Sequence, residues 1–384
     1  MANTNLSKAK SAKNDEFYTQ YADIQKEVNA YLDYDENVFR GKTILLPCDD
    51  PEWSNFTKFF AQNFERFGLK KLISTSYAIE SKNVKQVYQP TLFETAAPQF
   101  DRKKTRVRGK IFVLDHDTNK NGRIDIEDLE WDYLQGDGDF RSDEVKKLRD
   151  EADIIVTNPP FSLFREFLAW IVGDAAGSST PPYRGDGRAV SMKPPSTKKF
   201  LIIGNMNALK YKEAFPLIQK NLMWLGASIH SGDREFGVPD EYPLYATGAR
   251  IDENGRKFIR VKGVRWYTNI EHGRRHQPLQ LMTEADNIKY SKHKEVRDVG
   301  YQHYENYDAI EVPFTDAIPS DYKGMMGVPI SFLDKYCPEQ FEILGHMDSH
   351  GKVPKGIPDE APYLNGKWVY SRILIRHKRK GKAK

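Results

Sequence analysis

One short stretch of the chain has residue types that suit catalysis at an amine, Asn158-Pro159-Pro160-Phe161. It directly follows the apolar run DIIVT (153–157), which predicts a buried strand. The two prolines fix their own φ angles and lack N–H donors, so the turn is stiff and its carbonyls stay open to a ligand. The side-chain oxygen of Asn158 and the main-chain oxygen of Pro159 can together accept both N–H donors of one amino group.

Such an arrangement suits methyl transfer to nitrogen. Two acceptors stabilise the positive charge that develops on an attacking amine, and they also align it with an electrophilic methyl group. Phe161 offers a flat surface on which a base can stack. The alternative interpretation is a rigid loop with Phe161 in the core; the position after an apolar strand favours the functional one. The motif leaves the substrate open, because similar turns serve methylation of bases in RNA and of amide nitrogens in proteins.

The elements expected to position this turn alternate between strands and helices over about the first 200 residues. Ligands of open α/β sheets bind beyond the carboxyl ends of the strands, where the turn is expected. The pattern therefore predicts an α/β fold with a doubly wound, Rossmann-like parallel sheet. The expected strands are 43–46, 71–77, 110–114, 132–135, 153–157, 199–204 and 223–229, and the expected helices are 55–67, 143–151, 163–172 and 209–220.

The alternation predicts a catalytic domain over residues 1–230. Residues 173–198 are dense in Gly, Pro and Ser and predict a flexible insertion. From residue 231 the alternation of strands and helices is no longer evident, and the sequence becomes rich in Gly, Pro, Tyr and Arg. We interpret residues 231–384 as a smaller second lobe of mixed structure, with strand-like pieces at 264–270 and 372–375.

The net charge of +4 is too small to imply a nucleic-acid partner by itself. Its distribution is more informative, because basic stretches can neutralise backbone phosphates. A solvated face and a frayed tail are equally good explanations of either stretch alone. One basic stretch holds Arg256, Lys257, Arg260, Lys262, Arg265, Arg274, Arg275, Lys289, Lys292, Lys294 and Arg297, and another closes the chain between Arg372 and Lys384.

Two possible metal sites are weaker than their alternatives. Residues 117–128 (DTNKNGRIDIED) have the spacing of a calcium loop, but a strand-like stretch precedes them and Asn-Lys-Asn-Gly favours a hairpin turn. His272 and His276 are four residues apart without a suitably spaced third ligand, so zinc is not expected. We predict no metal centre.

Several stretches of the chain resemble the EcoRI-type adenine-specific DNA methyltransferases. The resemblance rests on KNDEFYTQYADI (13–24), PCDDPEWSNFTKFFAQNFERFGLKKLI (47–73), GDGDFRS (136–142), DIIVTNPPFSLFREFL (153–168), KFLIIGN (199–205) and GVPISFLDKYCPEQFEIL (327–344). It implies S-adenosyl-L-methionine as cofactor and double-stranded DNA as substrate. It also implies catalytic roles for Asn158, Pro159, Pro160 and Phe161.

The same resemblance assigns cofactor contacts. Phe17, Tyr18 and Thr19 match the motif that contacts the methionine portion; an aromatic staple on the first helix is the alternative. Asp139 and Phe140 match a motif at the cofactor's adenine, where the alternative is a surface turn. Cys48, Asp49 and Asp50 stand where relatives carry a glycine-rich turn, and this chain lacks those glycines; Asp49 or Asp50 is alternatively a helix N-cap. Glu80 is the candidate for the ribose hydroxyls.

The sequence thus predicts a site-specific DNA adenine N6-methyltransferase that flips its target base out of the duplex. A restriction-modification or orphan modification role is expected, with a cognate endonuclease as possible partner. The alternatives are an RNA or protein-glutamine methyltransferase and a non-catalytic DNA-binding protein. No apolar run is long enough to span a bilayer. The two cysteines, Cys48 and Cys337, suggest a reducing cytoplasm.

Overall fold

The computed structural model describes residues 18–47, 49, 54–78, 95–173, 198–230, 233–238, 249–347 and 361–378. The chain forms two compact units. The first comprises Met1–Met206 and Gly226–Ile270, and the second comprises Asn207–Leu225 and Glu271–Lys384. This division differs from the predicted boundary at residue 230, because strands beyond that residue pack into the first unit. The insertion expected at 173–198 lies, apart from its two end residues, outside the described residues.

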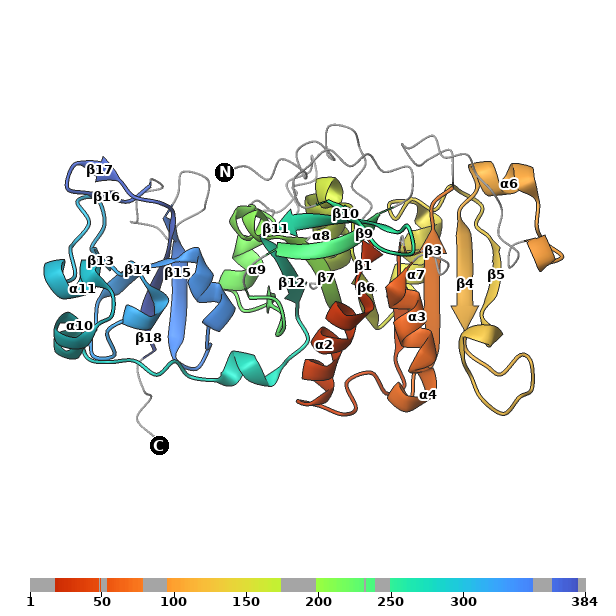
Figure 1. Cartoon of the computed structure of the whole chain (residues 1–384), viewed down its shortest axis with the longest axis horizontal. Helices are drawn as coiled ribbons and strands as arrows, with labels where there is room; N and C mark the ends of the chain where they lie inside the picture. The colour runs from red at the N-terminus through yellow and green to blue at the C-terminus, as the bar shows by residue number, and fades with distance from the viewer. Residues whose placement is uncertain are drawn as a thin grey trace, which may run out of the picture. The chain divides into compact units, whose positions relative to one another are not determined.

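A large mixed sheet forms the centre of the first unit (Figure 1). Its four central strands are parallel, as predicted, and end at one edge. The outer strands β4 and β12 run antiparallel to their neighbours, so the sheet is mixed, whereas the sequence predicted a parallel one. Within this unit the strand order is β5 (Glu130–Tyr133), β4 (Lys110–Leu114), β3 (Lys71–Ser76), β2 (Thr43–Leu46), β6 (Ile154–Thr157), β7 (Lys199–Asn205) and β12 (Val264–Thr268).

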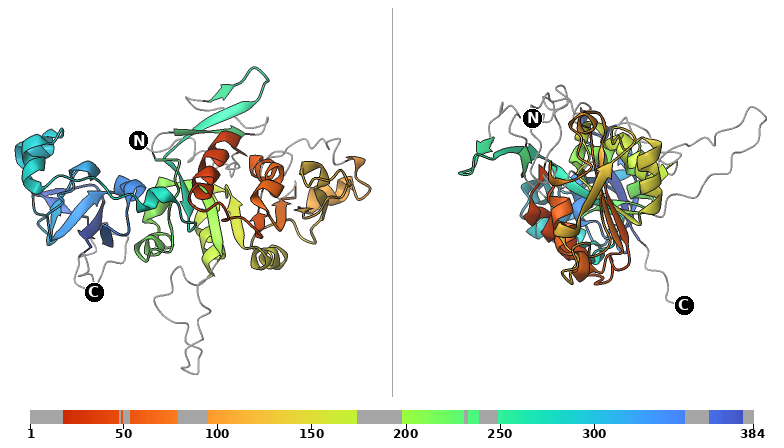
Figure 2. Two further views of the ribbon diagram at one scale, coloured as in Figure 1. Left: turned by 90° about the horizontal axis from the view of Figure 1, so that it is seen from below. Right: turned by 90° about the vertical axis from the view of Figure 1, so that its right-hand side faces the viewer.

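Helices cover both faces of this sheet (Figure 2). Alternate strand residues point to opposite faces. Ile44 and Leu46 therefore join one core cluster with the aromatic side chains of α3, while Tyr267 on the other face packs against Phe164 of α8. The helices of this unit are α2 (Tyr21–Leu32), α3 (Asn55–Gln62), α4 (Phe64–Phe67), α6 (Arg102–Val107), α7 (Asp143–Glu151) and α8 (Phe164–Val172).

A second, antiparallel sheet belongs to the same unit. It joins the N-terminal strand β1 (Tyr18–Thr19) to β9 (Asp233–Val238), β11 (Lys257–Lys262) and β10 (Arg250–Ile251). Phe236, Ile259 and Val261 from this sheet enter the same core cluster as Ile44. Their burial explains why the first unit extends to Ile270.

The polar segment between β4 and β5 connects two antiparallel neighbours. The strands end at Leu114 and begin again at Glu130, so Asn-Lys-Asn-Gly lies within a long loop and does not form the tight hairpin turn that was predicted. Asp128 organises this connection. One carboxylate oxygen accepts hydrogen bonds from Thr118 N, Thr118 Oγ1 and Asn119 N, and the other accepts one from Asp125 N. These donors lower the pKa of Asp128, the backbone N–H of Asp125 most strongly. A short 3-10 helix, Ile126–Asp128, precedes β5.

The second unit contains a four-stranded sheet and a separate hairpin. Among its described residues the sheet order is β13 (Ala309–Glu311), β14 (Met325–Pro329), β18 (Arg372–His377) and β15 (Phe341–Met347). The hairpin pairs β16 (Tyr363–Leu364) with β17 (Lys367–Trp368). The unit also contains the short strand β8 (Trp224–Leu225) and the helices α9 (Phe215–Gln219), α10 (Glu284–Tyr290) and α11 (Lys294–Val299). Over the described residues of both units, no helix combines the length and the apolar character that crossing a bilayer requires.

Candidate active site

The Asn-Pro-Pro-Phe turn lies at the carboxyl edge of the central strands, directly after β6. Asn158 is half-buried with its Oδ1 atom enclosed, and Pro159 is buried. Pro160 precedes a 3-10 turn (Phe161–Leu163) whose Leu163 N–H donates to the Pro160 carbonyl at 2.9 Å. Helix α8 begins immediately afterwards. The chain therefore passes from strand to helix through a short turn fixed at both ends.

Phe161 contacts the second sheet of the same unit. Its ring meets that of Phe236 on β9 edge to face, with centroids 6.4 Å apart. Phe161 remains half-buried, whereas Phe236 is buried. On β1, the residue that pairs with Phe236 is Thr19. Strand β9 thus brings the predicted catalytic turn and the predicted cofactor motif near one another.

Thr19 has a feature expected at a ligand site. Its side chain is 4% exposed, and its Oγ1 atom has no hydrogen-bond partner among the described residues. A buried hydroxyl without a partner is costly unless a ligand or water completes it. The carbonyl of Thr19 accepts a hydrogen bond from Asn55 Nδ2 at 2.7 Å, at the start of α3. Tyr18 lies beside it on β1, opposite Gly237.

Asp49 is the centre of a buried hydrogen-bond network beyond the end of β2. Ser54 Oγ donates to its Oδ1 atom at 2.8 Å, and Thr157 Oγ1 donates to its Oδ2 atom at 2.6 Å. Ser74 Oγ of β3 donates to its main-chain carbonyl. The alternative role of Asp49 as N-cap of α3 is wrong, because Ser54 occupies that position and accepts from Phe56 N.

The segment containing Asp139 and Phe140 lies against the end of β3. Ala78 N donates to Asp137 O at 2.8 Å, and a Cβ added at Gly138, whose φ is +87°, would lie 2.3 Å from the Ser76 carbonyl. Only glycine fits this close approach. The GDGDF turn is therefore docked at the same edge of the sheet as Asp49 and Asn158.

Asp139 and Phe140 also have protein partners there. Asp139 forms an ion pair with Arg141 at 2.6 Å, and this hydrogen-bonded partner lowers the pKa of the carboxyl group. The ring of Phe140 is fully buried and packs edge to face against Phe167 and Trp170 of α8. Their roles at the cofactor stay predictions. The other predicted cofactor residues, Phe17, Cys48, Asp50 and Glu80, lie outside the described residues.

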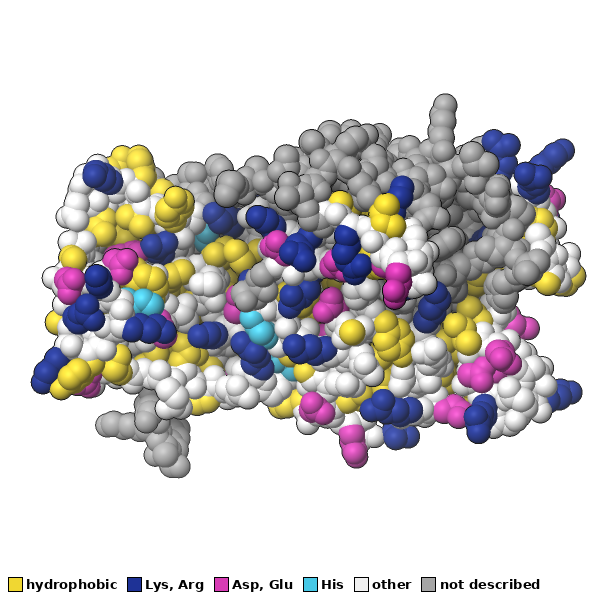
Figure 3. Space-filling view, in the orientation of Figure 1, with side chains coloured by type: hydrophobic (Ala, Val, Ile, Leu, Met, Phe, Trp, Pro, Cys, Tyr) yellow, Lys and Arg dark blue, Asp and Glu magenta, His cyan; other side chains and the backbone are white. Residues whose placement is uncertain are grey.

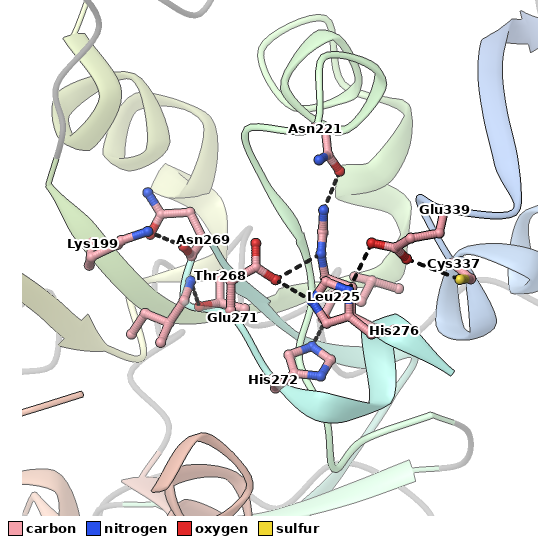
Figure 4. Close-up of polar contacts among 12 residues, drawn as sticks. Lys199, Asn221, Leu225, Thr268, Asn269, Glu271, His272, His276, Cys337 and Glu339 are labelled. Atoms are coloured by element: carbon pink, nitrogen blue, oxygen red, sulfur yellow. Dashed lines mark hydrogen bonds and ion pairs between the residues drawn. The ribbon is translucent and has the colours of Figure 1, made fainter. Parts of the chain in front are cut away.

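The two histidines four residues apart belong to a polar cluster in the second unit, drawn in Figure 4. His276 contacts Glu271 at 3.1 Å and Glu339 at 2.9 Å. His272 is buried and contacts the Leu225 carbonyl at 3.0 Å, and desolvation lowers its pKa. Within the parts of the chain that are described, no cluster of His, Cys, Asp and Glu has the arrangement of a metal site.

The basic stretch between 255 and 300 is not uniformly available to a polyanion. Arg265 and Arg275 are each only 4% exposed. Arg265 donates to main-chain carbonyls, and the guanidinium of Arg275 stacks 3.7 Å from the Trp224 ring centroid. Figure 3 shows lysine and arginine side chains spread over the visible face with acidic ones among them.

Sequence reasoning missed the residues that support the turn rather than form it. Thr157, Ser54 and Ser74 hold Asp49, and Phe236 contacts Phe161. One signal was available: small hydroxyl residues end the strands β3 and β6 at the edge of the sheet where the turn lies. Nothing local in the sequence indicates Phe236.

A mixed α/β sheet with this turn at the end of a central strand is the arrangement expected of a methyltransferase acting on an amino nitrogen. Comparison with known protein families identifies the family of methyltransferases to which the chain belongs. The family model described as adenine-specific methyltransferase EcoRI matches residues 5–175 and 181–378. The chain therefore belongs to this family of adenine-specific methyltransferases, and the resemblance noted in the sequence is confirmed.

Known relatives support this family assignment, and each aligns with the chain over most of its length. The Type II methyltransferase M.EcoRI of Escherichia coli is 40% identical over 97% of this chain and 96% of the relative. M.MgeORF184P of Mycoplasma genitalium is 30% identical, over 97% and 98%. M.MpnI of Mycoplasma pneumoniae is 31% identical, over 88% and 84%. No solved structure matches the chain.

Proposed function

We propose that this adenine-specific methyltransferase transfers a methyl group from S-adenosylmethionine to the N6 amino group of adenine at a specific site in duplex DNA. The observation that carries the proposal is the Asn158–Phe161 turn at the end of β6, beside the buried Asp49 network. Asn158 Oδ1 and the Pro159 carbonyl accept the two N–H bonds of the amine. They stabilise the charge that grows on nitrogen during the attack.

The cofactor fits the residues around this turn. The buried Thr19 hydroxyl lacks a protein partner among the described residues, as expected of an atom that a ligand completes. Tyr18, Thr19, Asp49, Asp139 and Phe140 are the described residues proposed to hold the cofactor. When bound, it supplies a methyl group on a positively charged sulfur. The arrangement supports a Rossmann-like classification of the first unit, since the central parallel strands carry the ligand residues at their carboxyl ends.

Reaching the turn requires the adenine to leave the duplex. Flipping a base costs a few kcal/mol, which stacking on Phe161 and contacts to phosphates would offset. Phe161 is half-buried and braced by Phe236, so its ring is fixed before the base arrives. This pre-positioning lowers the entropy lost on binding.

We assign DNA recognition to the second unit, in keeping with the predicted C-terminal lobe. Its β16–β17 hairpin presents Trp368, at 58% exposure, beside the exposed Lys367, and Tyr370, at 89% exposure, follows two residues after the hairpin. The hairpin is firmly anchored, because Gly366 N donates to Glu305 Oε1 at 2.7 Å and Glu305 N donates to Tyr363 O at 3.0 Å. A rigid β-ribbon with aromatic and basic side chains suits a DNA groove.

The cellular role follows from the same assignment. We propose that the enzyme acts in the cytoplasm as part of a restriction-modification system or as an orphan modification enzyme. All three relatives, which come from two bacterial genera, carry the Type II methyltransferase name, and this supports the first role. A cognate endonuclease acting on the same site is the expected partner in that case.

The test is a comparison of substrates and one variant. Labelled cofactor should methylate duplex DNA, and digestion to nucleosides should yield N6-methyladenine; label in structured RNA or protein alone would overturn the DNA assignment. Asn158→Ala should abolish transfer while cofactor binding persists. Asn269→Ala is the matched control, because the Asn269 side chain lies at the opposite edge of the sheet, where it accepts from Phe200 N and donates to the Lys198 carbonyl.

A further inference from the structure

We propose that Thr157, held by Asp49, is a positioning residue that fixes the Asn158 turn for methyl transfer. The proposal rests on the proposed catalytic role of Asn158 and adds a residue pair that acts through it. Thr157 is the last residue of β6, is fully buried, and directly precedes Asn158. Its orientation therefore sets where the turn leaves the sheet.

Thr157 is tied to the neighbouring strand at the carboxyl edge. Its Oγ1 atom lies 2.6 Å from Asp49 Oδ2 and 2.9 Å from the Pro47 carbonyl. A hydroxyl has one proton to donate, and the shorter contact has the length of a charge-assisted bond to a carboxylate. Strands β2 and β6 are parallel neighbours, so this bond joins their two ends.

Asp49 is itself held from two further elements. Ser54 Oγ, at the start of α3, donates to its other carboxylate oxygen at 2.8 Å. Ser74 Oγ of β3 donates to its main-chain carbonyl, and Thr57 Oγ1 lies 3.1 Å from Ser74 Oγ. Asp49 is only 7% exposed. A buried carboxylate keeps its partners because leaving it without them is costly.

The network has a consequence for catalysis. Pro159 and Pro160 stiffen the turn after Asn158, so the remaining freedom lies on its strand side. The Thr157–Asp49 bond removes that freedom. A displacement of about 1 Å at a reacting group can cost about 100-fold in rate. Asp49 thus links the turn that follows β2 to the position of the amine acceptor.

The test is an isosteric change that removes the donor. Thr157→Val should lower kcat by about 10- to 100-fold, while KM for DNA changes little. The melting temperature should fall as well, because a buried oxygen of Asp49 loses its donor. Thr157→Ser, which keeps the hydroxyl, should restore most of kcat. Asp49→Asn should lower kcat in the same direction, and the double variant should be no slower than the slower single variant, because both remove one interaction.

Thr268→Val is the matched control. Thr268, labelled in Figure 4, is equally buried, and its Oγ1 donates to the Phe200 carbonyl at 2.7 Å. Because β12 runs antiparallel to β7 and β6 runs parallel to it, the end of β12 lies at the opposite edge of the sheet from Thr157. Thr268→Val should leave kcat unchanged. Wild-type kcat in Thr157→Val, failure of Thr157→Ser to restore kcat, or an equal loss in Thr268→Val would overturn the proposal. An active Asn158→Ala would instead overturn the proposed role of Asn158.

Discussion

Phe161 and Phe236 stand edge to face, with ring planes at 89° and centroids 6.4 Å apart. One ring belongs to the turn after β6 and the other to the second sheet of the same unit. The contact fixes the plane of the half-buried Phe161 ring. On the proposed function, a base that enters the site would meet an aromatic surface whose orientation is already set.

Removing that surface should weaken methylation. Stacking of a base on an aromatic side chain contributes about 1–3 kcal/mol, so Phe161→Ala should lower kcat/KM for duplex DNA by about 10- to 100-fold. Phe161→Tyr keeps the ring and should retain most activity. Steady-state methylation assays give both values; a Phe161→Ala enzyme with wild-type kcat/KM would mean that the ring serves only packing.

Glu27 gives the first unit a dependence of stability on pH. Its fully buried carboxylate accepts hydrogen bonds from Ala227 N at 2.8 Å, Ser228 N at 2.7 Å and Tyr31 OH at 2.6 Å. Burial raises the pKa of Glu27 above its ordinary value of 4.5. The folded state therefore holds the proton more tightly, and the stability from this group falls as pH rises from about 4.5 through the raised pKa.

Glu27→Gln should remove that dependence. At neutral pH it should lower the free energy of unfolding by about 1–3 kcal/mol, because the new NH₂ group opposes one of the two main-chain N–H donors. Denaturant unfolding, followed from the ordinary pKa of 4.5 up to neutral pH, measures both effects. Tyr31→Phe removes only one donor and serves as the milder control. Equal pH dependence in Glu27→Gln and the wild type would show that other groups cause it.

The loop between β4 and β5 should not bind calcium. Both Asp128 oxygens are occupied by donors from the loop, and Asp117 accepts from Asn121 N and Gly122 N. We expect no heat in a calcium titration and no shift in melting temperature. Asp128→Ala should lower the melting temperature, because it leaves several N–H groups without their acceptor. A calcium-dependent rise in stability that Asp128→Ala abolishes would contradict this prediction.

The exposed aromatic residues of the β16–β17 hairpin and of the segment after it should contribute to DNA affinity rather than to chemistry. A double change, Trp368→Ala with Tyr370→Ala, should raise KM for duplex DNA by about 10-fold or more and leave kcat near the wild-type value. Tyr34→Ala is the control, since Tyr34 is also exposed, at 49%, but belongs to the first unit. Unchanged KM in the double variant would exclude the hairpin from the DNA interface.

Local pattern predicted the elements nearest the site well. The strand β2 and the helix α7 have the predicted bounds, and Gly68 ends the helical stretch with φ +62° as a left-handed cap. The strand before Asn158 is also confirmed. These features depend on periodicity, capping and turn chemistry, each of which is determined by a few neighbouring residues.

Contacts between distant segments were not predictable in this way. Strand β9, with the sequence DREFGV, pairs with β1 and β11, and its partners come from far along the chain. The antiparallel course of β4 likewise depends on pairing with β3 and β5. Phe140 was predicted at the cofactor from resemblance, while its complete burial against α8 depends on packing that no single motif encodes.

The chain passes between its two units three times, at Met206/Asn207, Leu225/Gly226 and Ile270/Glu271. Neither unit is therefore a single uninterrupted stretch. Cutting the gene at one point cannot separate them. On the proposal that the second unit recognises DNA, an exchange of specificity between relatives must carry 207–225 together with 271–384.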